Sequence, residues 1–412
     1  MRNEECGVRN AECGVRTDWP LFFRQQVKAN VHFWLSRLAT CRAQDETLLR
    51  ERSNIVKALS LALKLEAAWE PALDLMLAFH PFVNWQGGGA GWESLLEAGL
   101  TISRQRGDVG REAALLDRLG EWKQSQGDWA AAIACHEAAA RLSAQIGDEA
   151  GRVRALTNAG QVYHLRGQHT QARMALEQAL AGCRGCQDLT GQAFVHNHLG
   201  LIALDQQQWD QALLHLQRAY ELWAKAQNLG GMAQAQYNLG NLYLVQGDRP
   251  QAERCYRAAI ALYEQTNAGI PLARAIMAMG NLSLQQDRPD QAEQFYHQAR
   301  ERMQAVGYTL GLAQVFNNLG LACARQQRWA VAEDHFRRSI ALWQQLDQPV
   351  GRANAEDNLA ELYLHQQRWQ EAAELLAQAQ ERLAGLERTG RVASLLADIE
   401  KHRQRAERFR TG

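Results

Sequence analysis

The stretches GRVRALTNAGQVYHLRGQHTQARMALEQALAGC (residues 151–183) and GMAQAQYNLGNLYLVQGDRPQAERCYRAAIALY (residues 231–263) decide the fold. They align without a gap, so that Gly160 corresponds to Gly240 and Ala172 to Ala252. Self-similarity at a fixed period is the sequence signature of repeat architectures. The chain is therefore expected to consist of a series of similar units.

Two columns of small residues extend this alignment along the chain at one constant spacing. The first column comprises Gly120, Gly160, Gly200, Gly240, Gly280, Gly320 and Ala360. The second comprises Ala132, Ala172, Ala212, Ala252, Ala292, Ala332 and Ala372. The columns define seven units between residues 111 and 390, and we interpret their small side chains as points where two helices approach closely.

Each unit contains two apolar runs with the helical period of 3.6, such as ALTNAGQVYHL and ARMALEQALAGC, separated by a short polar break. Residues suited to the left-handed position after a helix recur at Gly107, Gly147, Asn267 and Gly307. Residues suited to cap the following helix recur at Asp108, Asp148, Asp188 and Asn228. The pattern predicts one helical hairpin per unit. Because a lone hairpin buries too little surface to be stable, the hairpins must stack into an all-α solenoid of antiparallel helix pairs.

Charge and hydropathy exclude several classes of partner. The 412 residues include 45 basic and 45 acidic side chains, whereas nucleic-acid binders normally carry a basic excess. The N-terminal MRNEECGVRNAECGVR lacks the apolar segment of a secretory signal. Charges interrupt the other apolar stretches before they reach the length that a transmembrane helix needs. We expect a cytoplasmic protein that binds neither nucleic acid nor membrane.

The unit resembles the tetratricopeptide repeat. The similarity lies in the Leu-Gly pair, a Tyr in the first helix (Tyr163, Tyr243 and Tyr363), the Ala that opens the second helix, and the Leu or aromatic residue that follows it. The length of the unit is typical of the longer-helix subclass found in peptide receptors and in cargo or polarity adaptors. The resemblance implies a right-handed superhelix with the first helix of each unit on its concave side.

The flanking regions suggest a domain organisation. We predict a disordered tail at residues 1–19, a helical N-terminal cap at 20–110, the seven units at 111–390 and a capping helix at 391–412. Residues 20–110 resemble the helical connector that joins the nucleotide-switch module of STAND-type signalling ATPases to a repeat sensor. That resemblance implies a sensor half without its own ATPase half.

The sequence offers no constellation of catalytic or metal-binding residues. The glycine-rich NWQGGGAGWES at 84–94 lacks the Gly-Lys-Ser/Thr of a P-loop, so we interpret it as a turn. Cys183 and Cys186 form a single C-x-x-C without the second pair that a structural zinc site needs. His196 and His198 are two apart on a helix, so they face different directions. We therefore expect no enzyme activity, metal or cofactor.

Tryptophans recur in the turn inside the hairpin, at Trp129, Trp209, Trp329 and Trp369. An exposed tryptophan is often a binding anchor. A strict period favours the alternative that each one closes its hairpin and is partly buried by the next unit.

The family resemblance places a set of polar residues in the concave groove. The predicted partner-binding residues are Asn197, Tyr237, Asn238, Asn241, Arg274, Asn281, Asn317, Asn318 and Arg325. An asparagine amide can pair with both the N–H and the C=O of an extended peptide. Asn158, Asn238, Asn318 and Asn358 could equally bond between neighbouring helices, so Asn197, Asn241, Asn281 and Asn317 are the better ligand candidates.

Two functional hypotheses follow. The first is a non-enzymatic scaffold or sensor that binds a protein or peptide segment in the groove. The alternative is the regulatory sensor half of a STAND-type system, acting on a nucleotide-binding signalling partner. A helical array that recognises RNA one base per unit is less consistent with a neutral protein that lacks basic stripes.

Overall fold

The computed structural model describes residues 19–40, 51–65, 68–84, 91–185, 187–386 and 390–410. Over these ranges all regular secondary structure is helical, with nineteen helices and no strand. Contacts divide the chain into two parts, residues 1–80 and residues 81–412. The N-terminal tail at 1–18, the glycine-rich loop at 85–90 and Cys186 lie outside the described residues. The predicted domain boundaries stay a prediction.

The N-terminal part contains α1 (Trp19–Thr40), α3 (Arg52–Ala62) and most of α4 (Trp69–Asn84). Helix α1 packs against α3. Val31 of α1 and Leu59 of α3 are completely buried, so these helices have a defined apolar face.

The second part is a continuous array of helices. It starts with α5 (Trp92–Arg106) and ends with α20 (Gly390–Arg410). Between them, the first helix of each pair is called an A helix: α6 (Val109–Ser125), α8 (Glu149–Leu165), α10 (Leu189–Asp205), α12 (Leu229–Val245), α14 (Gly269–Gln285), α16 (Thr309–Arg325) and α18 (Pro349–His365). The B helices are α7 (Trp129–Gln145), α9 (His169–Gly185), α11 (Trp209–Lys225), α13 (Arg249–Thr266), α15 (Pro289–Ala305), α17 (Trp329–Gln345) and α19 (Trp369–Leu383).

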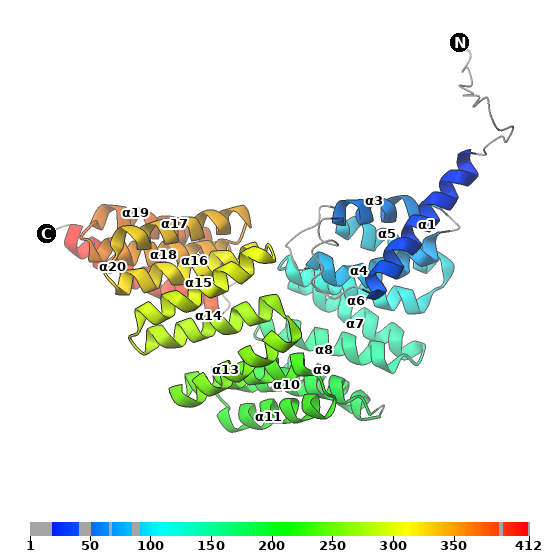
Figure 1. Ribbon diagram of the computed structural model, residues 1–412, viewed down its shortest axis with the longest axis horizontal. Coiled ribbons are helices and arrows are strands. Elements are labelled where there is room, and N and C mark those ends of the chain that lie inside the picture. Colours follow the sequence, from blue (N-terminus) through cyan, green and yellow to red (C-terminus); the bar gives the residue numbers. More distant parts are fainter. Residues whose placement is uncertain are drawn as a thin grey trace, which may run out of the picture. The chain divides into compact units, whose positions relative to one another are not determined.

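The array is an α-solenoid, as predicted. Every helix from α5 to α20 packs against the next, and Figure 1 shows the hairpins stacked one on another. Each A helix from α6 to α16 also contacts the A helix of the next unit, whereas no comparable contact joins successive B helices in the described part of the array. The A helices of neighbouring units therefore pack more closely than the B helices do. We call the surface that the A helices present to solvent the A-helix row.

The turns recur at half the spacing of the units, because each hairpin and each connection between hairpins contains one residue with a left-handed backbone. These residues are Gly107, Gly127, Gly147, Gly167, Gln187, Gln207, Gln227, Gly247, Asn267, Asp287, Gly307, Gln327, Asp347 and Gln367. The predicted caps are confirmed, since the side chains of Asp108, Asp148, Asp188 and Asn228 each accept a hydrogen bond from a backbone N–H three residues later. Because helices of similar length alternate with turns at a constant spacing, all units keep the same register.

The glycine column marks the point where each A helix meets its B helix. A Cβ added to Gly240 would lie 2.5 Å from Cε1 of Tyr256, and one added to Gly280 would lie 2.4 Å from Cε1 of Tyr296. Both tyrosines are completely buried. The predicted close approach is therefore confirmed, and the absent side chain is replaced by a ring from the opposite helix.

The last helix, α20, packs on both α18 and α19. Its Leu395, Ile399 and Ala406 are buried in one cluster with Leu376 and Leu383 of α19. His402 of α20 also forms a hydrogen bond of 2.8 Å between its Nδ1 and Oδ1 of Asp357 on α18. The apolar side of the seventh hairpin is thereby covered.

Candidate functional site

All nine predicted partner-binding residues lie on four consecutive A helices. Asn197 is on α10; Tyr237, Asn238 and Asn241 are on α12; Arg274 and Asn281 are on α14; Asn317, Asn318 and Arg325 are on α16. Their environments differ. Seven of them fall into three groups, which are bonds between units, outward amides and arginines, and the other two, Tyr237 and Asn318, contact members of these groups.

The first group joins neighbouring units. Asn238 donates its Nδ2–H to Oδ1 of Asn197 over 2.7 Å, and Asn358 donates to Oδ1 of Asn317 over 2.9 Å. Asn197 is fully buried, and Asn317 is 7% exposed. These amides connect A helices in the way proposed for the Asn column, and neither Asn197 nor Asn317 presents its side chain at the surface. The ligand set considered below therefore consists of the exposed and half-buried residues.

At the start of the array an acid fills the same role. Asp117 of α6 accepts hydrogen bonds from Nδ1 of His136, from Nε of Arg154 and from Nδ2 of Asn158, at 2.8, 2.8 and 3.1 Å. Burial alone would raise the pKa of Asp117, but His136 and Arg154 hold it well below its usual range. Because Asp117 and His136 are both buried, their hydrogen bonds lie inside the packing of α6, α7 and α8.

The second group consists of Asn241 and Asn281, which occupy the same place in consecutive units. The hydroxyl of Tyr256 donates to Oδ1 of Asn241 over 2.7 Å, and that of Tyr296 donates to Oδ1 of Asn281 over 2.8 Å. Burial raises the pKa of both tyrosines, so they remain protonated donors. Asn318 also donates to Oδ1 of Asn281 over 3.1 Å.

These bonds fix the orientation of the two amides. Each Oδ1 is held by a buried phenol, and among the described residues no hydrogen bond uses the Nδ2 of Asn241 or Asn281. Asn281 is exposed, and Asn241 is half-buried. The N–H groups are therefore left to bond acceptors that come from outside the chain.

The third group is Arg274 and Arg325, which are both exposed. The guanidinium carbon of Arg274 lies 5.8 Å from the ring centroid of Tyr237, within the range of a cation–π contact. The Tyr237 ring in turn lies 5.9 Å from the ring of Tyr256. Arg274 is thus held over an aromatic surface beside the outward amides.

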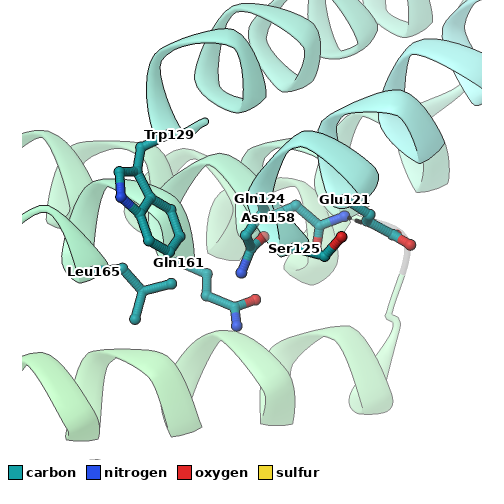
Figure 2. A pocket seen from close by; sticks show the side chains of 7 residues that line it. All are labelled: Glu121, Gln124, Ser125, Trp129, Asn158, Gln161 and Leu165. Atoms are coloured by element: carbon teal, nitrogen blue, oxygen red, sulfur yellow. Dashed lines mark hydrogen bonds between the residues drawn. The ribbon is translucent and has the colours of Figure 1, made fainter. Parts of the chain in front are cut away.

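Two cavities recur at the same position of different units. One, of about 460 Å³, is lined by Glu121, Gln124, Ser125, Trp129, Asn158, Gln161 and Leu165. Figure 2 shows Trp129 and Leu165 on one side of it and Glu121 and Ser125 on the other. The other, of about 370 Å³, is lined by Trp329, Asn358 and Arg325 among others, five units further on.

The turn tryptophans are half-buried, and Trp129 packs against Ile133 of its own hairpin and Val162 of the next unit. This agrees with the interpretation that they close the hairpins. Their recurrence was visible in the sequence, but the cavities were not, because a cavity depends on how two units stack. In the second cavity the His365 ring stacks on Trp329 at 6.4 Å with an interplanar angle of 12°.

A histidine contact was also hidden from the sequence. His196 of α10 and His215 of α11 lie 3.0 Å apart between their Nδ1 atoms. Burial, with a smaller effect of His215, lowers the pKa of His196 to about 4.

Among the described residues no group of three or more His, Cys, Asp or Glu is arranged to hold a metal ion. No described helix combines the length and apolar character needed to cross a bilayer.

Comparison with known proteins identifies the repeat. Models of the tetratricopeptide repeat match residues 111–185, 191–265, 272–345 and 357–386. No curated protein has a significant match to the sequence.

Several solved structures are similar to most of the chain. The Rap conjugation gene regulator of plasmid pLS20, in complex with the Phr* peptide, has a TM-score of 0.55 at 14% identity and matches over 93% of this chain and 96% of its own. The apo quorum sensor NprR from B. thuringiensis has a TM-score of 0.53 at 15% identity, over 88% and 99% of the two chains. At such low sequence identity, these structural matches show that the folds are similar and nothing more.

A STAND protein with a tetratricopeptide repeat sensor, from Pyrococcus horikoshii, is also similar. Its TM-score is 0.53 at 10% identity, and the match covers 79% of this chain. The match covers 53% of the STAND protein, so this chain spans about half of it.

Proposed function

The chain belongs to the tetratricopeptide repeat family, and from that premise we propose that its A-helix row binds an extended segment of a protein or peptide. In this proposal the protein is a scaffold or sensor without catalytic activity. The surface involved runs over α12 and α14, where the outward amides and Arg274 lie, and continues onto α16, where Asn318 donates to Asn281.

The observation that carries the proposal is the repeated pair formed by Asn241 with Tyr256 and Asn281 with Tyr296. The buried phenols keep each amide oxygen inward, so each Nδ2 can donate to a backbone carbonyl of a bound segment. Packed helices lie roughly 8–10 Å apart. A segment in the polyproline II conformation rises about 3.1 Å per residue and has three residues per turn, so equivalent amides on adjacent A helices would bond carbonyls three residues apart on the same side of the segment.

The similar structures also support the proposal that this chain binds a peptide. One is a Rap regulator in complex with a peptide, and another is a quorum sensor. By analogy we propose that binding by this chain serves signalling in the cytoplasm. The half-length similarity to a STAND protein supports the second candidate, in which the chain is a sensor that regulates a nucleotide-binding partner.

The test replaces the donors without disturbing the core. In the double variant Asn241→Asp and Asn281→Asp each side chain keeps an oxygen for the tyrosine hydroxyl but loses its N–H groups. The probe is an array of decapeptides of varied sequence. We expect the wild type to bind a subset and the double variant to lose at least tenfold in affinity for it, as for about 1.4 kcal/mol of lost hydrogen bonding.

A matched control carries the same charge change on the exposed B-helix residues, Gln294→Glu and Gln298→Glu, and should bind like the wild type. Thermal unfolding checks that both variants fold. Equal binding by the wild type and the Asn241/Asn281 variant, or no binding by the wild type to any decapeptide, would contradict the proposal.

A further inference from the structure

Helix α1 carries more apolar side chains than its packing in the N-terminal part covers. It packs against α3. Its buried side consists of residues three or four positions apart, namely Val27, Val31, Trp34 and Leu38. The rest of the helix carries four large apolar side chains that are between 43% and 54% exposed: Leu21, Phe22, Phe23 and Phe33. Such a concentration of exposed apolar residues marks an interaction site.

Three of these side chains, Leu21, Phe22 and Phe23, lie near the start of the helix, and we call them the α1 tip. Figure 1 shows this end of α1 extending beyond α3. Successive residues of a helix are rotated by about 100°, so the three side chains point to different sides. One helix or one groove of a protein partner would contact only one of these sides. A lipid interface surrounds a helix end that enters it and therefore covers all three.

The apolar surface continues from the α1 tip onto α3. Phe23 and Phe33 of α1 and Leu61 of α3 are among the residues that line a cavity of about 570 Å³. Leu61 is 40% exposed. Both helices thus present apolar side chains to the same cavity.

Basic residues accompany this surface. In the described residues of the N-terminal part, Lys and Arg outnumber Asp and Glu by six to three, although the whole chain is neutral. Helix α1 contains no acidic residue. Four cations are exposed and have no ion-pair partner among the described residues: Arg24, Lys28, Lys57 and Lys64. In the array, by contrast, arginines such as Arg328 are paired with a carboxylate.

These four cations lie close in sequence to the exposed apolar residues. Arg24 directly follows the α1 tip, and Lys28 is one turn further along α1. Lys57 is one turn before Leu61, and Lys64 follows Leu61 by three residues. Long basic side chains can lay their apolar stems on such a surface while their charges reach lipid headgroups.

A second copy of the chain fits this surface less well. Two copies that met here would bring their cations together, with no acidic residue of α1 to neutralise them, and like charges repel. An anionic lipid surface supplies both an apolar phase and the opposite charge.

We propose that the N-terminal part binds peripherally to an anionic membrane surface. The α1 tip enters the interface between the headgroups, and the four exposed cations contact the negative charges of the lipids. The neutral charge of the whole chain hides this local excess of positive charge. The inference is independent of peptide binding, because it concerns residues outside the array.

The experiment measures co-sedimentation of the full chain with lipid vesicles. One set of vesicles consists of phosphatidylcholine alone, and in the other set every fourth lipid is phosphatidylserine. We expect binding to the anionic vesicles to be at least tenfold tighter than binding to the neutral ones. The difference should decrease as the salt concentration rises, because ions screen the attraction.

Two double variants separate the apolar and the electrostatic contributions. Leu21→Ser with Phe23→Ser removes exposed apolar area and should weaken binding to anionic vesicles at least tenfold. Arg24→Gln with Lys28→Gln should weaken it by a similar factor but leave the binding to neutral vesicles unchanged. All four side chains are exposed, so both variants should fold, which thermal unfolding checks.

Matched controls make the same kinds of change elsewhere in the chain. Met174→Ser with Leu214→Ser removes two exposed apolar side chains from B helices. Lys401→Gln with Arg405→Gln removes two exposed cations from α20. Both controls should bind anionic vesicles like the wild type.

The proposal is overturned if the wild type does not sediment with anionic vesicles, or if either α1 variant binds them as tightly as its control. Light scattering tests the other occupant. A wild type that is dimeric in solution, with both α1 variants monomeric, would assign the surface to a second copy and would also overturn the proposal. None of these outcomes bears on peptide binding by the A-helix row.

Discussion

At the scale of single residues, the burial of His196 beside His215 makes stability depend on pH. Burial and the neighbouring His215 lower the pKa of His196 to about 4, from an ordinary value near 6.5. The folded state therefore binds a proton less readily than the unfolded state. Its stability is complete above about pH 6.5 and falls as the pH decreases toward 4, by at most roughly 3 kcal/mol for this group.

The measurement is the melting temperature of the wild type and of His196→Gln between pH 7 and pH 4. Glutamine already occupies the equivalent position, as Gln236, so the variant should fold. We expect its melting temperature to fall less steeply with decreasing pH than that of the wild type. Parallel curves for the two proteins would show that folding does not lower the pKa of His196.

Residue-level chemistry was also the hardest part to predict from the sequence. Their position outside the Asn column predicts Asn197 and Asn317 as ligand candidates, yet each is the buried acceptor for a member of that column. The pairing joins residues 41 positions apart, so it depends on the rotation between units, which no spacing within one unit reveals. The orientation of Asn241 and Asn281 is set by tyrosines of the B helix and was equally hidden.

At the scale of helices, the glycine column limits the distance between A and B helices. An alanine Cβ at position 240 would lie 2.5 Å from the buried Tyr256 ring, whereas one at Gly230, in the same helix, would meet nothing closer than 3.6 Å. We expect Gly240→Ala to destabilise the protein by about 1–3 kcal/mol through overpacking. Gly230→Ala should be neutral or stabilising, because alanine favours the helix. Urea unfolding measures both, and equal effects would contradict this account of the column.

The turns offer a second test at the same scale. Gln207 and Gln227, at the two ends of α11, have φ values of 57° and 54°, where a side chain is strained. Replacing either glutamine by glycine removes this strain but gives the unfolded chain more conformational freedom. We expect the net effect to raise the free energy of unfolding by about 0.5–1 kcal/mol.

The reverse substitution, Gly247→Ala at φ +82°, should destabilise the protein by a similar amount. Differential scanning calorimetry measures all three variants. A lower melting temperature in both glutamine-to-glycine variants would show that those side chains stabilise the turns.

Helices, caps and turns were largely predictable because their signals are local. The Asp and Asn caps and the left-handed residues at Gly107, Gly147, Asn267 and Gly307 all lie where the sequence placed them. Glutamine at Gln207, Gln227 and Gln367 carries no such signal, and only the period locates these turns.

At the scale of the whole molecule, α20 closes the apolar end of the solenoid. We expect Leu395→Ser combined with Ile399→Ser to lower the melting temperature and to promote association, because both side chains are buried against α19 and its neighbours. Ala397→Ser, on the exposed side of the same helix, is the control. Thermal unfolding and light scattering measure the two effects. If the double variant matched the control, α20 would not be needed to cap the array.

The constant length of the units also has a genetic consequence. Every unit is encoded by the same whole number of codons, so unequal recombination between two units inserts or removes complete units and keeps the reading frame. The joined units would meet through the same glycine, alanine and turn positions as before. Alleles of this gene could therefore differ in the number of units without loss of folding, and would encode binding surfaces of different length.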